Sequence, residues 1–234
     1  MFSIAILAGG LATRLRPITQ TIPKALVEVT GKPFIVRQLE YLRGQGVQRV
    51  VLCIGYLGEM IQDVVGTGER FGLQVNYSLD GTTLLGTGGA IKKALPLLGE
   101  HFFVLYGDSY LPVDFYGVQQ AYALSGQQAL MTVLENGDRW DKSNVLFQSG
   151  RLVEYNKRAP RPDMTYIDYG LGVVAAEVFA QYPADKPFDL ADVYQTLSRQ
   201  GQLAGLEVHE RFYEIGSHSG LKEAEDFFLT KEQA

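Results

Sequence analysis

The chain has 234 residues, 46% of them hydrophobic and 20% charged, which is typical of a globular protein with one large domain or two small ones. Its formal net charge of −5 gives no bulk attraction to nucleic acid or to an anionic membrane, so functional cations must be placed locally. The single cysteine, Cys53, excludes an intramolecular disulfide and any multi-cysteine metal site.

The chain begins with an apolar run, from Phe2 to Ala8, that precedes two glycines. A signal peptide starts with a basic segment, which this run lacks, so we interpret the run as a buried strand. No stretch reaches 18 consecutive apolar residues, and a membrane span is therefore not expected. Without an export signal or a disulfide, the expected location is the cytoplasm.

Short apolar runs alternate with helical patterns in the first half of the chain. The runs predict strands over Ser3–Leu7, Arg49–Ile54, 73–78 and 101–105. Helical spacing of the apolar residues predicts helices over 33–44, 57–65 and 90–98. Strands that are apolar on both faces and alternate with helices are typical of a parallel sheet covered by helices on both sides.

The second half of the chain has a different pattern. Short turns separate strands predicted over Ala129–Glu135, 144–148, Arg151–Tyr155, 171–175 and Leu203–Val208. Helices are predicted over 190–200, with Asp189 as the N-cap, and over 220–229. This pattern indicates a mixed or antiparallel extension of the sheet. Because no linker or repeat separates the halves, we expect a single α/β domain over residues 1–234.

The most informative stretch runs from Leu7 to Pro33. A predicted strand leads into Gly9 and Gly10, whose backbone can approach anionic oxygens without a Cβ in the way. Arg14 can bind phosphate oxygens through its forked guanidinium, and Lys24 adds a second positive charge. The spacing fits neither a P-loop nor the dinucleotide fingerprint, which argues against a nicotinamide dehydrogenase. The stretch therefore predicts a polyphosphate site of another type.

The string GGxxTRLRPxTxxxPKxLxxVxGKP resembles the signature loop of the sugar-1-phosphate nucleotidyltransferases. Four further segments extend the resemblance over nearly the whole chain: Leu85–Ala90 (LGTGGA), Tyr106–Ser109 (YGDS), Tyr169-Gly170 and Glu214–Ser217 (EIGS). The chain is similar to the short members, which include heptose- and mannose-1-phosphate guanylyltransferases and N-acetylmuramate-1-phosphate uridylyltransferases. The resemblance implies a Rossmann-like three-layer sandwich with a mostly parallel central sheet and a small mixed-strand extension.

The resemblance also implies roles for individual residues. About 1–125 would form the nucleotide-binding half, with contacts to base, ribose and phosphates from Leu7, Ala8, Gly9, Gly10, Thr13, Arg14, Lys24, Gly86 and Gly88. About 126–234 would form the sugar-phosphate half, where candidate contacts, together with Tyr106, are Asn144, Lys157 and Gly170. Arg14, Lys24 and Asp108 would be the catalytic residues, and Asp108 and Glu214 would bind Mg²⁺.

Three positions depart from the family pattern. Glu214 stands where the family usually has a second metal-binding Asp. The segment Tyr155-Asn156-Lys157-Arg158 lacks the glutamate that usually precedes the lysine, and Asn144 replaces a frequent glycine near the sugar. These departures leave open a non-catalytic sensor of sugar nucleotides on the same fold. The intact set of Arg14, Lys24 and Asp108 favours the enzyme.

The implied partners are small molecules, an NTP and a sugar 1-phosphate, with no nucleic acid and no membrane; the resemblance leaves a homodimer open. The segment LGTGGAI resembles the guanylyltransferases more than the thymidylyl enzymes, whereas residues 61–78 also resemble the uridylyl short forms. We therefore favour GTP with heptose or mannose 1-phosphate, and UTP, CTP and dTTP remain the alternatives.

Overall fold

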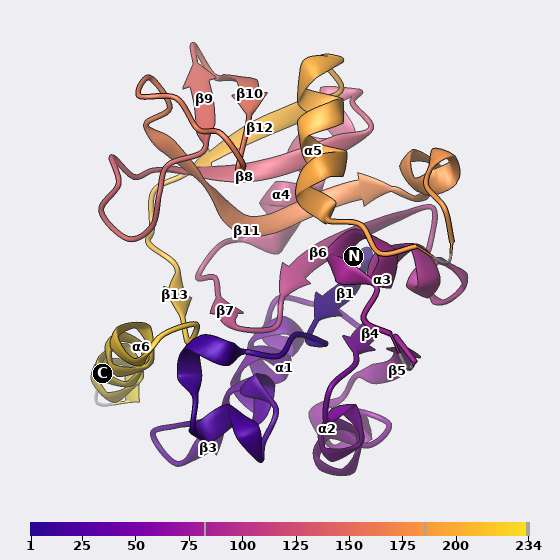
Figure 1. The fold of residues 1–234 in the computed structure, drawn as a ribbon, viewed down its shortest axis with the longest axis vertical. Coiled ribbons are helices and arrows are strands. Elements are labelled where there is room, and N and C mark those ends of the chain that lie inside the picture. Colours follow the sequence, from indigo (N-terminus) through magenta and orange to yellow (C-terminus); the bar gives the residue numbers. More distant parts are fainter. Residues whose placement is uncertain (82, 185, 233–234) are drawn as a thin grey trace.

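The computed structural model describes residues 1–81, 83–184 and 186–232. In these residues the main sheet contains nine strands, and the part formed by the first half of the chain is parallel. There β1 (Ser3–Leu7) lies between β6 (His101–Tyr106) and β4 (Arg49–Ile54), and β5 (Gln74–Leu79) follows β4. The four strands end on the same edge, which brings the loops after them together (Figure 1).

Helices cover both faces of this parallel part. On one face, α1 (Phe34–Gly44), α2 (Gly58–Val65) and α4 (Phe115–Ser125) pack with the apolar side chains of the strands. On the other face lies α3 (Gly86–Ala94), which buries Ile91 and Ala94 against Ala5, Val51 and Cys53. The three layers confirm the α/β class expected from strands that are apolar on both faces.

The second half extends the same sheet with mixed pairing (Figure 1, upper part). The long strand β11 (Tyr166–Ala175) runs antiparallel to both β6 and β8 (Ala129–Glu135). The outer strands are β9 (Val145–Gln148), β10 (Arg151–Tyr155) and β12 (Leu203–Val208). The helix α5 (Leu190–Arg199) packs on one face, and Asp189 caps it by accepting a hydrogen bond from Ala191 N, as the sequence predicted.

Three predicted elements differ from the observed ones by more than one residue at an end. The helix predicted over 90–98 begins at Gly86 and gives way to a 3-10 turn at Leu95, because its glycine-rich start is held by contact with Phe188 rather than by propensity. The strand predicted over 171–175 begins at Tyr166, since its first half contains polar residues and a glycine. The helix predicted over 220–229 extends over His218–Glu232, as α6. The sequence pattern missed α4 altogether.

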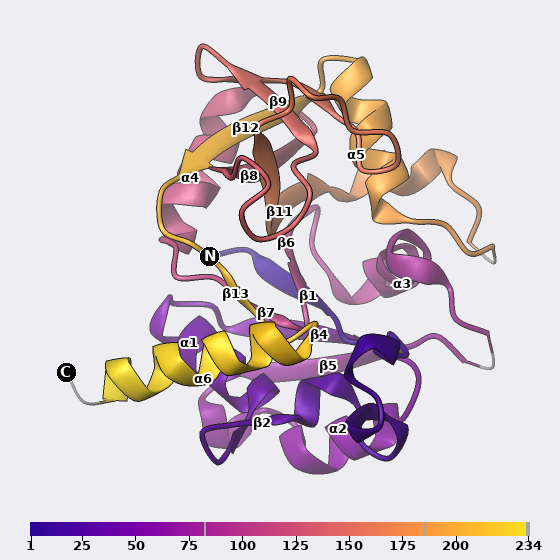
Figure 2. The ribbon, with the colours of Figure 1, turned by 60° about the vertical axis from the view of Figure 1, so that its left-hand side comes forward.

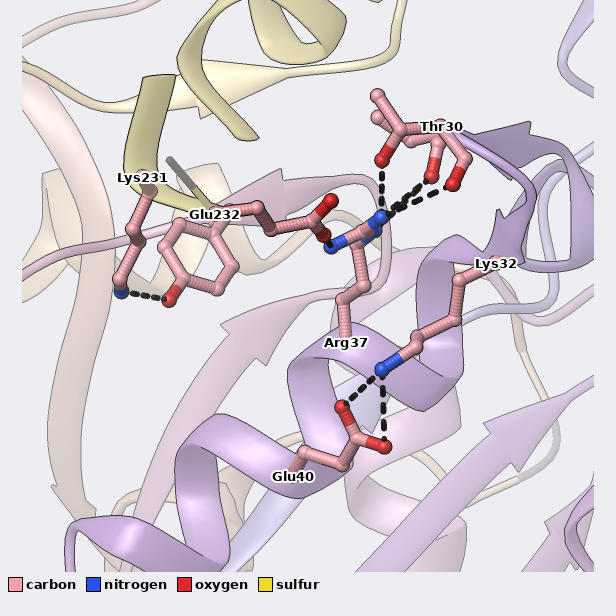
Figure 3. A network of polar contacts seen from close by, with 8 residues as sticks. Thr30, Lys32, Arg37, Glu40, Lys231 and Glu232 are labelled. Carbon is pink, nitrogen blue, oxygen red and sulfur yellow. Dashed lines mark hydrogen bonds and ion pairs between the residues drawn. The ribbon is translucent and has the colours of Figure 1, made fainter. Parts of the chain in front are cut away.

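The C-terminal helix α6 lies against the amino-terminal elements (Figure 2). It follows β13 (Tyr213–Glu214), which pairs with β7 (Ser109–Tyr110) directly after the Asp108 turn. Its end is fixed by Arg37 of α1, which forms an ion pair with Glu232 at 2.8 Å and donates to the backbone oxygens of Val29 and Thr30 (Figure 3). These contacts tie the C-terminus to the hairpin of β2 (Glu28–Val29) and β3 (Lys32–Pro33).

Among the helices of the described residues, none combines the length and the apolar character that crossing a bilayer requires.

Candidate active site

A cavity of about 230 Å³ opens at the carboxyl ends of β6, β1, β4 and β5. In open α/β sheets, ligands bind at this edge. The walls contain eight of the residues that the sequence motifs singled out, and these are Leu7, Ala8, Gly9, Gly10, Lys24, Gly86, Tyr106 and Asp108. Residues from three separate motifs therefore meet in one cavity.

Lys24 and Asp108 face each other at one side of the cavity. Lys24 Nζ donates to Asp108 Oδ2 at 2.7 Å, and the two side chains are only 19% and 23% exposed. Pro23, in an extended conformation, starts the short 3-10 turn Lys24–Leu26, which buries Ala25 and Leu26 and leaves Lys24 facing the cavity. Asp108 follows β6 directly. The ion pair thus joins the glycine-loop segment to the sheet edge.

Arg14, Asp108 and Glu214 converge beside Gly216. A Cβ placed on Gly216 would lie 3.1 Å from Arg14 Nη2, 3.4 Å from Glu214 Oε1 and 3.6 Å from Asp108 Oδ2. Any larger residue at position 216 would fill the space between these charged groups. Burial raises the pKa of the Glu214 carboxyl above its ordinary value, and the charge of Asp108 adds to this effect. Two carboxylates and one guanidinium therefore share a small, partly desolvated volume.

Buried neighbours of these charged residues hold them in place. Leu15, next to Arg14, and Ile215, next to Glu214, are both fully buried in one apolar cluster with Phe34 and Phe228. Ile215 N also donates to the backbone oxygen of Asp108 at 2.9 Å. The loop and the strand that carry the charges are thus fixed by the same small core.

The site fits a magnesium ion. In the residues that the structure describes, no group of three or more His, Cys, Asp or Glu side chains could hold a metal ion. Mg²⁺, however, is usually bound by one or two carboxylates together with substrate phosphates and water. Asp108 and Glu214, which converge beside Gly216 next to the cavity, match that requirement.

Three predicted nucleotide contacts, Thr13, Arg14 and Gly88, lie outside the cavity wall. Thr13 is exposed on the loop before the cavity. Gly88 is buried under the ring of Phe188, where an added Cβ would come within 2.4 Å of that ring. The glycine at 88 therefore serves the close packing of α3 against the segment that leads into α5, and the ligand contact expected there stays a prediction.

The predicted sugar-phosphate residues lie around β11. Gly170, at a φ of +101°, sits beside Tyr106, and a Cβ added to it would be 3.7 Å from the Tyr106 ring. Asn144 is buried, and its Oδ1 accepts a hydrogen bond from Asp168 N at 3.0 Å, so this side chain ties β9 to β11. Lys157 is exposed. Gly170 and Asn144 are therefore fixed by their neighbours, whereas the Lys157 side chain is open to solvent.

Comparison with known proteins agrees with the motifs and the geometry. A family model described as nucleotidyl transferase matches residues 4–143, which is more than half of the chain. The chain belongs to the nucleotidyl transferase family. This confirms the family and the class of enzyme expected from the sequence motifs.

The similarity of this nucleotidyl transferase to the following relatives extends over nearly the whole length of both chains. It is 30% identical to the N-acetylmuramate alpha-1-phosphate uridylyltransferase of Neisseria meningitidis, over 94% of this chain and 95% of that protein. It is 27% identical to the D-glycero-alpha-D-manno-heptose 1-phosphate guanylyltransferase of Campylobacter jejuni, over 90% and 93%. The crystal structure of HddC from Yersinia pseudotuberculosis complexed with GMP-PN superposes with a TM-score of 0.79 at 27% identity, covering 97% and 100% of the two chains.

Sequence reasoning gave no role to three residues of this nucleotidyl transferase site. Asp80, directly after β5, lines the cavity, and only its place at a strand end could have indicated it. A Cβ added to Gly107 would lie only 2.8 Å from Leu7 O, so a glycine is needed where the two strand ends approach each other. Gln38 is buried in α1, and its side-chain amide donates hydrogen bonds to the backbone oxygens of Tyr106 and Ser109 at 3.0 and 2.7 Å. It therefore fixes both ends of the turn that carries Asp108.

A half-buried acid, Asp168, was also missed. It lies in β11 beside Gly170, whose N–H donates to Asp168 Oδ1 at 3.0 Å. Burial raises the pKa of this carboxyl to about 6, while that hydrogen bond and the charge of Lys157 oppose the rise. Carboxyl groups whose pKa is raised by burial occur often at functional sites.

Trp140 is anchored by its neighbours. Its ring packs edge-on against Phe212 at 6.1 Å, and the guanidinium of Arg211 lies 5.1 Å from its centre.

Proposed function

We propose that the chain transfers a nucleoside monophosphate from an NTP to a sugar 1-phosphate, and that GTP with heptose or mannose 1-phosphate is its preferred pair. The observation that carries this proposal is the convergence of Arg14, Lys24, Asp108 and Glu214 beside the cavity at the sheet edge. Two cations and two carboxylates are the groups that a reaction between two phosphate anions and a metal ion requires.

The reaction needs positioning more than proton transfer. A phosphate oxygen of the sugar 1-phosphate attacks the α-phosphorus of the NTP. The new P–O bond forms as the bond to the β-phosphate oxygen breaks, and pyrophosphate leaves with that electron pair. The attacking oxygen is already anionic at neutral pH, so no general base is required. The barrier lies in charge repulsion and alignment, which fixed cations and backbone donors lower.

The roles of the chain's own residues follow from their places. Gly9 and Gly10 end β1 at the cavity, where their backbone can approach the nucleotide. Lys24 would lie between the two reacting phosphates, and Arg14 would hold the phosphates that leave. Asp108 and Glu214 would hold Mg²⁺, which when bound neutralises phosphate charge.

The choice of GTP is the finer part of the proposal. The names of the relatives point in two directions, because the Neisseria protein is a uridylyltransferase and the Campylobacter protein is a guanylyltransferase. HddC, with 100% of its chain covered, was solved with GMP-PN. On this ground and on the LGTGGAI segment, we favour GTP over UTP.

A matrix of substrates tests both parts. Purified protein is incubated with MgCl₂, each of GTP, UTP, CTP and dTTP, and each of several sugar 1-phosphates, and pyrophosphate release is measured. Release that needs both substrates and is fastest with GTP supports the proposal. Release with another NTP would overturn the choice of base alone. No release with any pair, combined with measurable binding of a nucleotide sugar, would favour the sensor.

A further inference from the structure

A buried glutamine holds the turn that carries Asp108. Gln38, on α1, is only 2% exposed. Its Nε2 donates to Tyr106 O at 3.0 Å and to Ser109 O at 2.7 Å, so one hydrogen bond lies before Asp108 in the chain and the other lies after it. A single side chain from another element therefore fixes the backbone on both sides of the carboxylate.

The chemistry of its two partners fixes the orientation of this amide. Tyr106 O and Ser109 O are carbonyl oxygens, which only accept hydrogen bonds, so the NH₂ group of Gln38 must face them. The Oε1 atom of Gln38 is then left buried, and it accepts no hydrogen bond from the residues that the structure describes. Both donors of the amide are thus committed to the turn, while its acceptor has no partner among these residues.

The buried oxygen indicates that Gln38 serves the turn rather than the core. Most of the other buried positions in α1 are apolar, and these are Phe34, Ile35, Leu39 and Leu42. A buried polar atom without a partner lowers stability, and an apolar residue at position 38 would avoid that loss. Stability is often lost at positions where function requires a particular group.

The turn that Gln38 holds also places the second carboxylate of the site. Ser109 pairs with Glu214 where β7 meets β13. On the cavity side of the same turn, Lys24 Nζ donates to Asp108 Oδ2 at 2.7 Å. A shift of the turn would therefore displace both carboxylates and the ion pair together.

We propose that Gln38 is a positioning residue, whose amide holds the Asp108 turn in the geometry that metal binding and phosphate transfer require, a role that rests on the proposed function. Gln38 does not line the cavity, so it acts through the backbone of the turn and not on the substrates. Residues that orient a metal ligand from behind contribute about 10- to 100-fold to metal affinity or activity. An effect of that size is expected for Gln38.

Two substitutions of similar length remove the donors in steps. Gln38→Met removes both N–H groups, so Tyr106 O and Ser109 O lose this donor. In Gln38→Glu, burial beside two carbonyl oxygens keeps the new carboxyl protonated at about pH 6, and one donor remains. The matched control is Tyr41→Phe, because Tyr41, also on α1, donates to a backbone oxygen beyond the turn, that of Val113, at 3.1 Å.

Three measurements at about pH 6 test the role, and two of them need no turnover. They are hydrogen exchange of the backbone amides of 107–110, the dissociation constant for Mn²⁺ from its paramagnetic resonance signal, and steady-state constants for pyrophosphate release in MgCl₂. In Gln38→Met, exchange should be about tenfold faster. Mn²⁺ should bind about 10- to 100-fold more weakly and kcat should fall by a similar factor, with KM for the sugar 1-phosphate unchanged. Gln38→Glu should lie between, and Tyr41→Phe should keep the Mn²⁺ affinity and kcat.

A lower melting temperature of Gln38→Met with unchanged Mn²⁺ affinity and kcat would show a merely structural residue and overturn the inference. Equal losses of kcat in Gln38→Met and Tyr41→Phe would overturn it as well. If Gln38→Met does not fold, Gln38→Glu decides, and unaltered constants in that variant would count against the role. If the unaltered protein releases no pyrophosphate with any substrate pair, the proposed reaction fails, and the Mn²⁺ affinities alone decide whether Gln38 positions the carboxylates.

Discussion

The nucleotide side and the sugar side of the sheet edge hold their charged residues differently. On the nucleotide side, Lys24 and Asp108 are paired at 2.7 Å, and Glu214 is held through the buried Ile215 beside it. On the sugar side, Lys157 is exposed, and Asn144 is engaged by the backbone of Asp168. Groups that must stabilise a transition state need to be fixed in advance, whereas groups that recognise one of many sugars tolerate change. The rigid side is therefore expected to determine the rate, and the open side to determine the substrate.

The largest effect is expected at Asp108. Asp108→Asn removes one of two carboxylates at the site and weakens metal binding, so kcat for pyrophosphate release should fall about 10³-fold. Steady-state assays over a range of MgCl₂ would measure this, with circular dichroism confirming the fold. Full activity of the variant, or of the unaltered protein in excess chelator, would show that the nucleotide side does not work through a metal ion.

Substitutions of Lys24 and Arg14 should change different kinetic constants. Lys24→Ala should lower kcat about 10²–10³-fold, because the cation between the reacting phosphates acts mainly in the transition state. Arg14→Ala should mainly raise KM for the nucleotide, since in the proposed reaction Arg14 holds the phosphates that leave. Arg16→Ala, an exposed cation of the same loop, serves as the control and should change neither constant much. A reversed pattern would show that these roles are exchanged.

A substitution at Glu214 distinguishes two roles for this side chain, a metal ligand and an acid with no part in the reaction. Its longer side chain reaches the volume beside Gly216 that it shares with Asp108 and Arg14. Glu214→Gln should raise the MgCl₂ concentration needed for half-maximal rate and lower kcat about tenfold, with little change in the melting temperature. Glu210→Gln, an exposed acid nearby in sequence, is the control. An unchanged metal requirement would leave Asp108 as the one carboxylate that serves the ion.

The sequence predicted the strands of both sides better than the helices that cover them. Continuous apolar runs predicted the bounds of β1 and β4 as observed, because strands buried on both faces need such runs. Short turns on either side predicted the bounds of β8, β10 and β12. The pattern missed α4, where Gly117 and the exposed Tyr116 and Leu124 obscure the helical spacing.

The site was predictable wherever a residue belongs to a contiguous motif, as Lys24 and Asp108 do. Asp80 and Asp168 were missed because their importance arises from which strands become neighbours. No local pattern records that β5 contributes to the same edge as β6, or that β11 continues the sheet beside β6.

On the sugar side, Lys157 should govern substrate binding rather than rate. Lys157→Ala should raise KM for the sugar 1-phosphate about tenfold and leave KM for the nucleotide unchanged, since one exposed charge contributes about 1 kcal/mol. The neighbouring cation Arg158 already pairs with Asp192 at 2.6 Å, so Arg158→Ala is the matched control. Equal changes in the two variants would assign the effect to general positive charge at this edge.

The last effect, which concerns stability rather than rate, is expected at Asp168. Its folded-state pKa of about 6 lies above the ordinary value of 3.8, so the unfolded chain ionises first as the pH rises. Stability contributed by this group therefore falls as the pH rises from about 4 to 6, and the loss is complete above pH 6. Asp168→Asn keeps an acceptor for Gly170 N–H and removes the charge. The variant should be more stable than the unaltered protein by about 2–3 kcal/mol at pH 7.5, with the difference vanishing near pH 4.

Thermal or urea unfolding at the two pH values measures this difference. Asp163→Asn provides the control of opposite sign, because Arg161 lowers the pKa of the exposed Asp163 carboxyl. If Asp168→Asn is stabilised at pH 7.5 but binds the sugar 1-phosphate less well, the carboxylate is retained for recognition at the expense of stability, as functional sites often are. A variant that is destabilised at pH 7.5 would show instead that Lys157 and Gly170 fully compensate the buried charge, and the acid would then belong to the framework of β11.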